Sequence, residues 1–105
     1  MKWSYVPEVS KNIRFVEFEG YHGVPCVNAS HVHMTEILES LLRAFEQPIA
    51  LGWWLRGDGL VQVEIRTRAG SVNATKLAKR WGGNGQKYAA GFQAGMARWA
   101  QVVTR

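Results

Sequence analysis

Two apolar runs joined by an Asp-Gly turn constrain the fold of this chain more than any other feature. Residues 49–55 are apolar throughout, whereas residues 60–67 alternate, with Val61, Val63 and Ile65 pointing to one side. An Asp-Gly pair before an alternating run is a strong signal of a β-hairpin, because its residues tolerate the backbone angles of a tight turn. We therefore expect two paired strands, the first of them covered on both faces.

Further elements are expected on both sides of this hairpin. Residues 13–18 alternate loosely and predict a strand, and the short apolar run 24–29 predicts a second, buried one. Residues 34–46 predict a helix that ends before Pro48, because their apolar side chains recur at helical spacing. These side chains form one stripe: Ile37, Leu38, Leu41, Leu42 and Phe45.

The last third of the chain is expected to be mainly helical. Ser71 and Asn73 are good caps for a short helix over 74–81, which would end at Gly82. Residues 86–90 are expected to start another helix, and residues 96–103 predict a C-terminal one.

The predicted fold class is α+β, with a small mixed sheet of about four or five strands covered by helices. The chain has 105 residues, which leaves room for one domain. We place this domain at residues 13–105 and interpret residues 1–12 as a lead-in or linker.

Basic residues are concentrated in the second half of the chain. Residues 1–50 contain four Lys or Arg against six Glu, a balance of −2, whereas residues 51–105 contain nine against two acidic residues, a balance of +7. Such a field attracts anionic partners, although a solvated basic face would have the same composition.

Several other classes of protein and site are not favoured. A single cysteine, Cys26, excludes an internal disulfide and a Cys-x-x-Cys site, and its apolar neighbours predict a buried, inert thiol. His22, His31 and His33 do not have the spacing of a closed zinc site, so we expect no metal in this chain. No apolar run approaches the length of a membrane helix and no signal peptide is visible, so we expect a cytoplasmic domain without membrane contact.

Residues 82–85, Gly-Gly-Asn-Gly, are the strongest local signal of a binding site. Glycines allow close approach of the backbone to a ligand, and successive exposed amides beside a helix start can bind an anion. The alternative is a helix cap followed by a tight turn. The segment is neither a Walker loop nor a dinucleotide fingerprint, because the spacing of its glycines and lysine fits neither pattern.

The sequence around this segment resembles the DHHA1 domain of the DHH-family phosphoesterases. Residues 77–92 share the family's run of glycines followed by Ala-Ala-Gly-Phe, and Arg66 corresponds to the arginine of the family's Ser-Leu-Arg-Ser strand. The similarity extends over about residues 13–95. Three positions depart from the pattern: Asn84 replaces a glycine, Gln86 replaces a histidine and Glu64 replaces a serine. A glutamine keeps hydrogen-bonding capacity but carries no charge.

The resemblance implies a substrate-binding module without catalytic activity of its own. It implies that the backbone amides of 82–85 and the Arg66 guanidinium bind a phosphate, and that Gln86 hydrogen-bonds the ligand. The candidate binding residues are Arg66, Arg68, Gly82, Gly83, Asn84, Gly85, Gln86 and Lys87. Arg68 and Lys87 would contribute charge. The partner would be single-stranded nucleic acid, a short oligonucleotide or a nucleotide.

In the family, catalysis belongs to a separate DHH domain that holds divalent manganese. This chain has no Asp-His-His motif, so we expect no cofactor in it and no phosphoesterase activity from it alone. Such a DHH domain would be its partner if the natural protein is longer. The alternative function is a free-standing interaction or self-association domain with a basic surface, for example a homodimer. The sequence does not distinguish RNA, DNA, a cyclic dinucleotide and a 3′-phosphorylated nucleotide.

Overall fold

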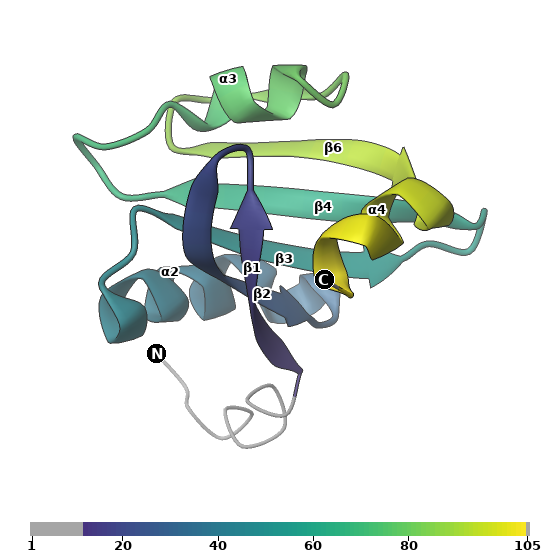
Figure 1. Ribbon diagram of the computed structural model, residues 1–105, viewed down its shortest axis with the longest axis horizontal. Helices are drawn as coiled ribbons and strands as arrows, with labels where there is room; N and C mark the ends of the chain where they lie inside the picture. Colours follow the sequence, from purple (N-terminus) through teal and green to yellow (C-terminus); the bar gives the residue numbers. More distant parts are fainter. Residues whose placement is uncertain (1–11, 105) are drawn as a thin grey trace.

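A computed structural model describes residues 12–104 and shows a twisted sheet with helices on both of its faces (Figure 1). Residues 1–11, in the expected lead-in, and Arg105 lie outside the described residues. The elements in chain order are β1 (Ile13–Phe18), β2 (Tyr21–Asn28), the short 3-10 helix η1 (His31–His33), α2 (Met34–Phe45), β3 (Ile49–Leu55), β4 (Leu60–Thr67), α3 (Ala74–Lys79), β5 (Asn84–Gly85), β6 (Ala89–Gly95) and α4 (Met96–Val103).

The sheet has six strands in the order β1-β2-β3-β4-β6-β5. Strands β2 and β3 are parallel and the other neighbours are antiparallel, so the sheet is mixed. The parallel pair is joined through α2, as a parallel connection requires a crossover. The α+β fold class with a mixed sheet is therefore confirmed, with six strands rather than the four or five expected.

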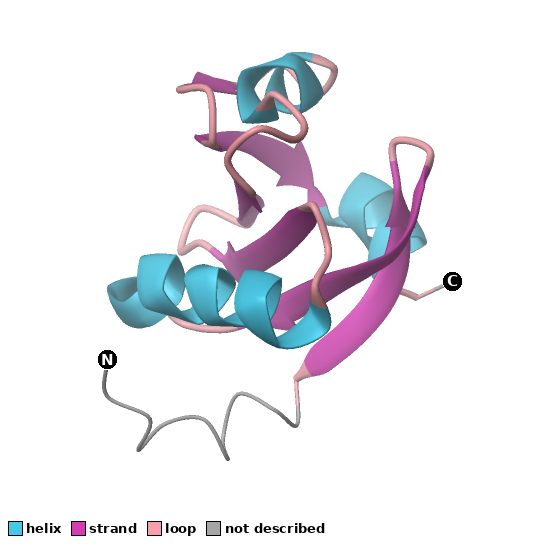
Figure 2. Cartoon of the chain, turned by 90° about the vertical axis from the view of Figure 1, so that its left-hand side faces the viewer, coloured by secondary structure: helices cyan, strands magenta, loops and turns pink. Residues whose placement is uncertain are grey.

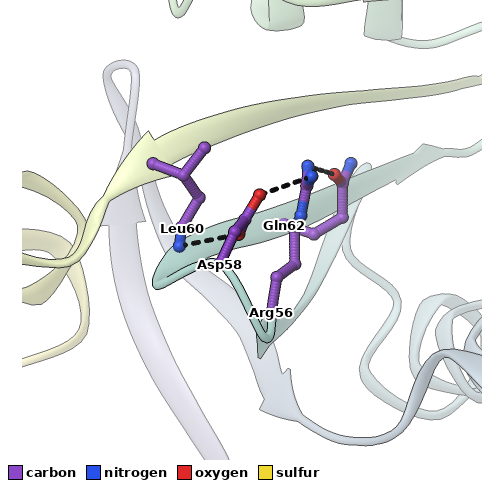
Figure 3. Close-up of polar contacts among 4 residues, drawn as sticks. All are labelled: Arg56, Asp58, Leu60 and Gln62. Carbon is purple, nitrogen blue, oxygen red and sulfur yellow. Dashed lines mark hydrogen bonds and ion pairs between the residues drawn. The ribbon is translucent and has the colours of Figure 1, made fainter.

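The turn between β3 and β4 forms as its sequence predicts (Figure 3). The Asp58 carboxylate accepts a hydrogen bond from the Leu60 N–H at 3.1 Å and pairs with the Arg56 guanidinium at 2.8 Å. Gly59 has φ +88°, a left-handed angle that glycine adopts without steric cost. The turn fixes the register of the hairpin, in which Gly52 lies opposite Glu64.

Helix α2 covers one face of the sheet, and α3 and α4 lie against the other (Figures 1 and 2). Four residues of the apolar stripe of α2, Ile37, Leu38, Leu41 and Leu42, pack on Val27 and Ala50, whereas Phe45 is exposed and contacts Phe15. The larger core lies on the opposite face, where the inward side chains of β3, β4 and β6 meet α3, α4 and the β1–β2 hairpin. The aromatic centre of this core is Phe18, Trp53, Trp81, Phe92 and Trp99.

The expectation of a helix starting at residues 86–90 is wrong, because residues 89–95 form strand β6. Ala90, Phe92 and Ala94 alternate into the core, and the strand pairs with β4 along its whole length. Pairing with a strand distant in the sequence thus determines the secondary structure of this segment, because its small residues have little preference for helix or strand. The expected loop at 82–85 contributes a second new strand, because Asn84 and Gly85 pair with β6 as β5.

The other expected elements exist with shifted ends. The second strand is Tyr21–Asn28 rather than 24–29, because the turn lies at Glu19–Gly20. The short helix ends at Lys79 rather than at residue 81, and the long helix ends at Phe45 rather than at residue 46. The first strand, the central hairpin and the C-terminal helix have the predicted bounds. Within residues 12–104 there is no helix with the length and apolar character needed to cross a membrane.

The glycine at position 83 is required by close packing of two backbones. A Cβ atom there would lie 2.1 Å from the Gly91 carbonyl oxygen and 2.5 Å from the Phe92 Cβ. Such contacts cannot be relieved by a side-chain rotation, since one partner is backbone. Gly83 therefore lets α3 and the strand pair β5–β6 lie against each other.

Gly83→Ala is expected to lower the free energy of unfolding by about 2 kcal/mol or more, because the added methyl group overpacks this contact. Gly57→Ala is the matched control, since nothing lies within 4 Å of a Cβ at that position. We expect the control to change stability by less than about 0.5 kcal/mol. Urea unfolding followed by tryptophan fluorescence measures both, and equal midpoints for the two variants would refute the packing role.

Candidate functional site

A basic groove lies where the C-terminal half of α2, the end of β4 and the start of β6 meet. Its volume is about 520 Å³. It is lined by Glu39, Leu42, Arg43, Arg66, Thr67, Arg68, Ala69, Gln86, Lys87, Tyr88 and Ala89. We call it the basic groove. The structure thus brings together four of the eight candidate binding residues: Arg66, Arg68, Gln86 and Lys87.

The charge of the basic groove is strongly positive. Among residues 12–104, four cations line it, Arg43, Arg66, Arg68 and Lys87, and Glu39 is the one acidic lining residue. A concave surface with a net charge of about +3 concentrates anions and speeds their encounter, because the protein walls focus the field. The groove therefore has the electrostatics of a phosphate-binding site.

Arg66 occupies the boundary between the sheet and α2. Its Nη2 donates to the Glu39 Oε2 at 2.9 Å, and its side chain is 27% exposed. Opposite Arg66 in the sheet lie Ala50 on β3 and Ala89 on β6, two small side chains that leave room above the strand. A guanidinium carries five N–H donors, so one bond to a carboxylate leaves the others for a ligand.

Arg68 is held at the end of α2. Its Nη2 donates to the carbonyl oxygen of Leu42 in the last turn of that helix and to the Gln47 carbonyl at 3.3 Å. A cation at this position satisfies otherwise unpaired carbonyl groups and interacts favourably with the helix dipole. Arg68 therefore combines a structural role with its place in the groove.

Residues 86–88 form the outer wall of the basic groove and are fixed by backbone hydrogen bonds. The Gln86 N–H donates to the Ala89 carbonyl at 2.7 Å, and the Lys87 and Tyr88 carbonyls accept from the N–H groups of Ala74 and Thr67 at 2.7 and 3.0 Å. Such a turn holds the Gln86 and Lys87 side chains at the groove although both are exposed.

Tyr88 adds an aromatic ring to this wall. The Lys87 ammonium lies 5.5 Å from the ring centroid, and the Tyr88 hydroxyl accepts a hydrogen bond from the Gly70 N–H at 3.2 Å. This hydrogen bond, followed by the charge of Lys87, lowers the pKa of the Tyr88 phenol from its usual value.

The glycines at 82 and 83 do not offer their amides to a ligand. The Gly82 N–H donates to the Lys79 carbonyl at 3.1 Å, and the Gly83 N–H donates to the Ala78 carbonyl at 2.9 Å. These bonds end α3, as the alternative interpretation of a helix cap and tight turn requires. Neither these glycines nor Asn84 and Gly85 line the basic groove. The expected cradle of loop amides is therefore not formed by Gly82 and Gly83, and the arginine side chains line a different surface.

A second pocket of about 260 Å³ continues from the basic groove along β4. The two share Arg66 and Ala89. The second pocket is lined by His31, Met34, Thr35, Leu38, Trp54, Gln62, Glu64, Ile65, Arg66 and Ala89. We call it the inner pocket; it combines an apolar and aromatic wall with one carboxylate.

Cys26 is buried in β2, as its neighbours predicted. Burial raises the pKa of its thiol to about 12, and Arg14 lowers it by a smaller amount. His22 lies on the β1–β2 hairpin beside Glu17, whereas His31 packs on Trp54 with ring centroids 5.4 Å apart. In the described part of the chain, no three His, Cys, Asp or Glu residues are grouped so that they could hold a metal ion.

Trp81, which the sequence assigned to the core, packs on Phe92 with ring centroids 4.7 Å apart. Its indole N–H donates to Glu19 at 3.2 Å, and the guanidinium carbon of Arg98 lies 3.9 Å from the ring centroid. Arg80 also pairs with Glu19, at 3.0 Å. Two cations of the basic half therefore lie away from the groove: Arg80 joins the β1–β2 hairpin to the end of α3, and Arg98 joins α4 to Trp81.

Sequence reasoning did not find Glu39 and Arg43, which come from the acidic half of the chain. They are four residues apart on α2, so they lie on the same side of the helix one turn apart. The signal was present as a charged pair beside the apolar stripe. Only the packing of α2 next to β4 shows that this pair borders a groove.

We expect Cys26 to react with thiol reagents only when the chain unfolds. A rise of its pKa from 9.0 to about 12 reduces the thiolate population at pH 8 on the order of a thousandfold, and burial blocks access as well. Because the pKa of the Cys26 thiol is higher in the folded chain, the protonated thiol favours the folded state. This contribution to the free energy of unfolding is complete below pH 9 and is lost as the pH rises from about 9 toward 12. Labelling with Ellman's reagent with and without urea checks this, and rapid labelling of the native chain would contradict it.

The sequence matches no protein-family model and no curated protein. Among solved structures, the fold is similar to part of PggH, a pGpG-specific phosphodiesterase from Vibrio cholerae, with a TM-score of 0.66 over 92% of this chain. Sequence identity is 11%, and the chain spans about one third, 34%, of the length of that protein. At this identity the likeness shows the fold alone. The DHHA1-like architecture of this chain is thus an arrangement that also occurs within a phosphodiesterase.

Proposed function

We propose that this chain is a nucleotide-phosphate and nucleic-acid binding module that is not catalytic on its own. The observation that carries the proposal is the basic groove, where four cations meet one carboxylate in a concavity of about 520 Å³. Arginine is well suited to phosphate because its planar fork can donate two parallel hydrogen bonds. Arg66 supplies this contact, with Arg43 and Lys87 as further sources of charge.

In this proposal, a bound phosphate takes over the contact that Glu39 makes with Arg66. A phosphate that enters the groove replaces or shares the Glu39 carboxylate, which holds Arg66 at 2.9 Å in the absence of ligand. The exposed fractions of the Arg66 and Glu39 side chains are 27% and 44%, so solvent screens the ion pair and little free energy is needed to replace it. Glu39 thereby orients the guanidinium and also competes with the anion.

The fold favours a place beside a phosphoesterase domain. One solved structure that it resembles is a phosphodiesterase, and this chain spans about a third of that protein, 34%. We infer that the module is the substrate-binding half of a DHH-type enzyme, with manganese and catalysis in a separate DHH domain. The described residues provide no three-ligand metal site of their own. Their part is to bind the ligand's phosphate and orient the rest of the molecule.

Arg66→Ala is expected to weaken binding of pGpG and of short oligonucleotides at least about tenfold, because it removes a charge-assisted phosphate contact. Lys79→Ala is the matched control, since Lys79 is an exposed cation on α3 outside the groove. The control loses the same net charge. We expect its binding affinity to change less than twofold, because a cation outside the groove attracts the ligand only weakly through screening solvent. Isothermal titration at two salt concentrations measures both, and wild-type binding is expected to weaken with salt.

Equal affinities of the two variants would remove Arg66 from the site. Absence of binding by the wild-type chain, together with a concentration-dependent oligomer in light scattering, would instead favour the alternative of a self-association domain.

Glu39→Gln is expected to tighten phosphate binding several-fold, because it removes the carboxylate that competes for Arg66. Glu17→Gln is the control, a loss of the same charge on the β1–β2 hairpin outside the groove. Titration with inorganic phosphate and pGpG compares the two. Weaker binding by Glu39→Gln would show that the carboxylate acts only by orienting Arg66.

A further inference from the structure

The Glu64 carboxylate is the feature of the inner pocket that the phosphate-binding role leaves unexplained. Glu64 lies on β4 two residues before Arg66, so both side chains are on the same face of the sheet. Its side chain is half-buried, and no ion pair to it is found within residues 12–104. A carboxylate beside an anion site repels the ligand's phosphate. It is therefore suited to accept hydrogen bonds from another part of the ligand.

The two neighbours of Glu64 across the sheet are both glycines, and Gly91 is the one that leaves space for the carboxylate, because the Met34 side chain occupies the space at Gly52. Gly52 lies opposite it on β3 and Gly91 opposite it on β6. A Cβ at residue 91 would lie 2.6 Å from the Glu64 Oε2, so the carboxylate lies directly over this glycine. Gly91 belongs to the Ala-Ala-Gly-Phe motif, whose glycine is thus explained by the space that the carboxylate needs.

Gln62 orients the Glu64 carboxylate from one side. The Gln62 Nε2 donates to the Glu64 Oε2 at 3.0 Å. The Gln62 Oε1 accepts a hydrogen bond from the Arg56 Nη1 at 3.5 Å (Figure 3). A carboxylate has two oxygens with about four acceptor positions in all. One donor from Gln62 therefore leaves the carboxylate able to accept two further N–H groups from a ligand.

The remaining wall of the inner pocket suits a flat aromatic ring. Trp54 is partly buried against the cluster that contains Met34 and Leu38 of α2, and the His31 ring contacts it at a centroid distance of 5.4 Å, tilted by 37°. Nucleobases stack on such side chains. The pocket thus offers a stacking wall and a carboxylate, and Arg66 lies at the junction with the basic groove.

From these contacts we propose that the inner pocket binds a nucleobase and that Glu64 selects guanine. This inference rests on the proposed phosphate-binding function of the adjoining groove. Guanine presents two adjacent donors, N1–H and N2–H, which match the two oxygens of one carboxylate; adenine and cytosine place an acceptor nitrogen beside their amino group. The Glu64 and Arg66 positions are about 7 Å apart along β4. A 5′-nucleotide can therefore reach both sites across one sugar.

The inference is tested by titrating the full chain with 5′-GMP, 5′-IMP, 5′-AMP and ribose 5-phosphate. IMP keeps N1–H but lacks the 2-amino group, and ribose 5-phosphate lacks the base. We expect the wild-type chain to bind GMP about tenfold more tightly than IMP or AMP, the discrimination typical of a paired hydrogen-bond contact to a base. Equal affinity for the three nucleotides and ribose 5-phosphate would overturn the base site and leave the phosphate site intact. No binding of any of the four probes would overturn the proposed function itself.

Glu64→Gln is expected to reduce the affinity for GMP to that for IMP. The amide NH₂ group is a donor and cannot accept a hydrogen bond from one of the two guanine N–H groups. Its affinity for ribose 5-phosphate is expected to stay the same or rise, since a negative charge near the phosphate is lost. Glu17→Gln serves again as the control and is expected to keep the preference for GMP. An unchanged preference in Glu64→Gln would overturn the role of Glu64. The wild-type ratio of GMP to IMP tests base recognition even if this variant does not fold.

Trp54 supplies an independent readout of the same site. We expect GMP, but not ribose 5-phosphate, to quench tryptophan fluorescence, because a base enters the inner pocket next to the indole ring. Trp54→Phe is expected to remove this quenching and to retain the preference for GMP. Quenching of the same size in Trp54→Phe would place the base elsewhere and contradict the assignment.

Discussion

The two-faced pattern of strand β4 is the constraint on which the rest of the structure depends. Val61, Val63 and Ile65 are fully or almost fully buried in the larger core. Alternation then forces Glu64 and Arg66 onto the opposite face. Because β4 lies between β3 and β6, a shift of its register by one residue would bury the charged groups and expose the apolar ones. The energy of the core therefore fixes the position of the polar face.

The open space above this face is created by residues that lack bulk. Ala50 and Ala89 flank Arg66, and Gly52 and Gly91 flank Glu64. A larger side chain at Ala89 would reach into both pockets, and one at Gly91 would displace the Glu64 carboxylate. Gly52 instead makes room for the Met34 side chain. The glycines near the end of α3 have a different use, since Gly83 permits close contact between backbones. Small residues thus act here mainly by making room, and the binding groups are side chains.

The charges divide into two sets with separate physical roles. Arg80 pairs with Glu19 and joins the β1–β2 hairpin to the end of α3, and Arg98 lies over the Trp81 ring and joins α4 to it. The cations of the basic groove lie instead around a concavity, where Glu39 offsets only part of their charge. A net charge calculated from the sequence adds both sets together. The proposed phosphate site depends only on the cations of the basic groove. The proposed choice of base depends on the Glu64 carboxylate, which a net charge counts only as one negative charge.

Local sequence determined much of the fold, because hairpins and amphipathic helices depend on residues close in the chain. The bounds of the β3–β4 hairpin and of α4 followed from the Asp-Gly turn and from apolar spacing. The α+β class followed from the order of the predicted strands and helices, and its DHHA1-like form from the resemblance of residues 77–92. Sequence also selected Arg66, Gln86 and Lys87, which lie together in the basic groove.

Tertiary structure alone decided how the last third of the chain folds and where the site lies. Ala-Ala-Gly-Phe has no strong local preference, and it forms β6 because β4 offers a partner and the core accepts Phe92. The amides of Gly82 and Gly83 were expected to face a ligand, but α3 consumes them. Glu39 and Arg43 reach the groove only through the packing of α2 on the sheet. Contacts between distant segments, which no local pattern encodes, determine which of the charged residues share one concavity.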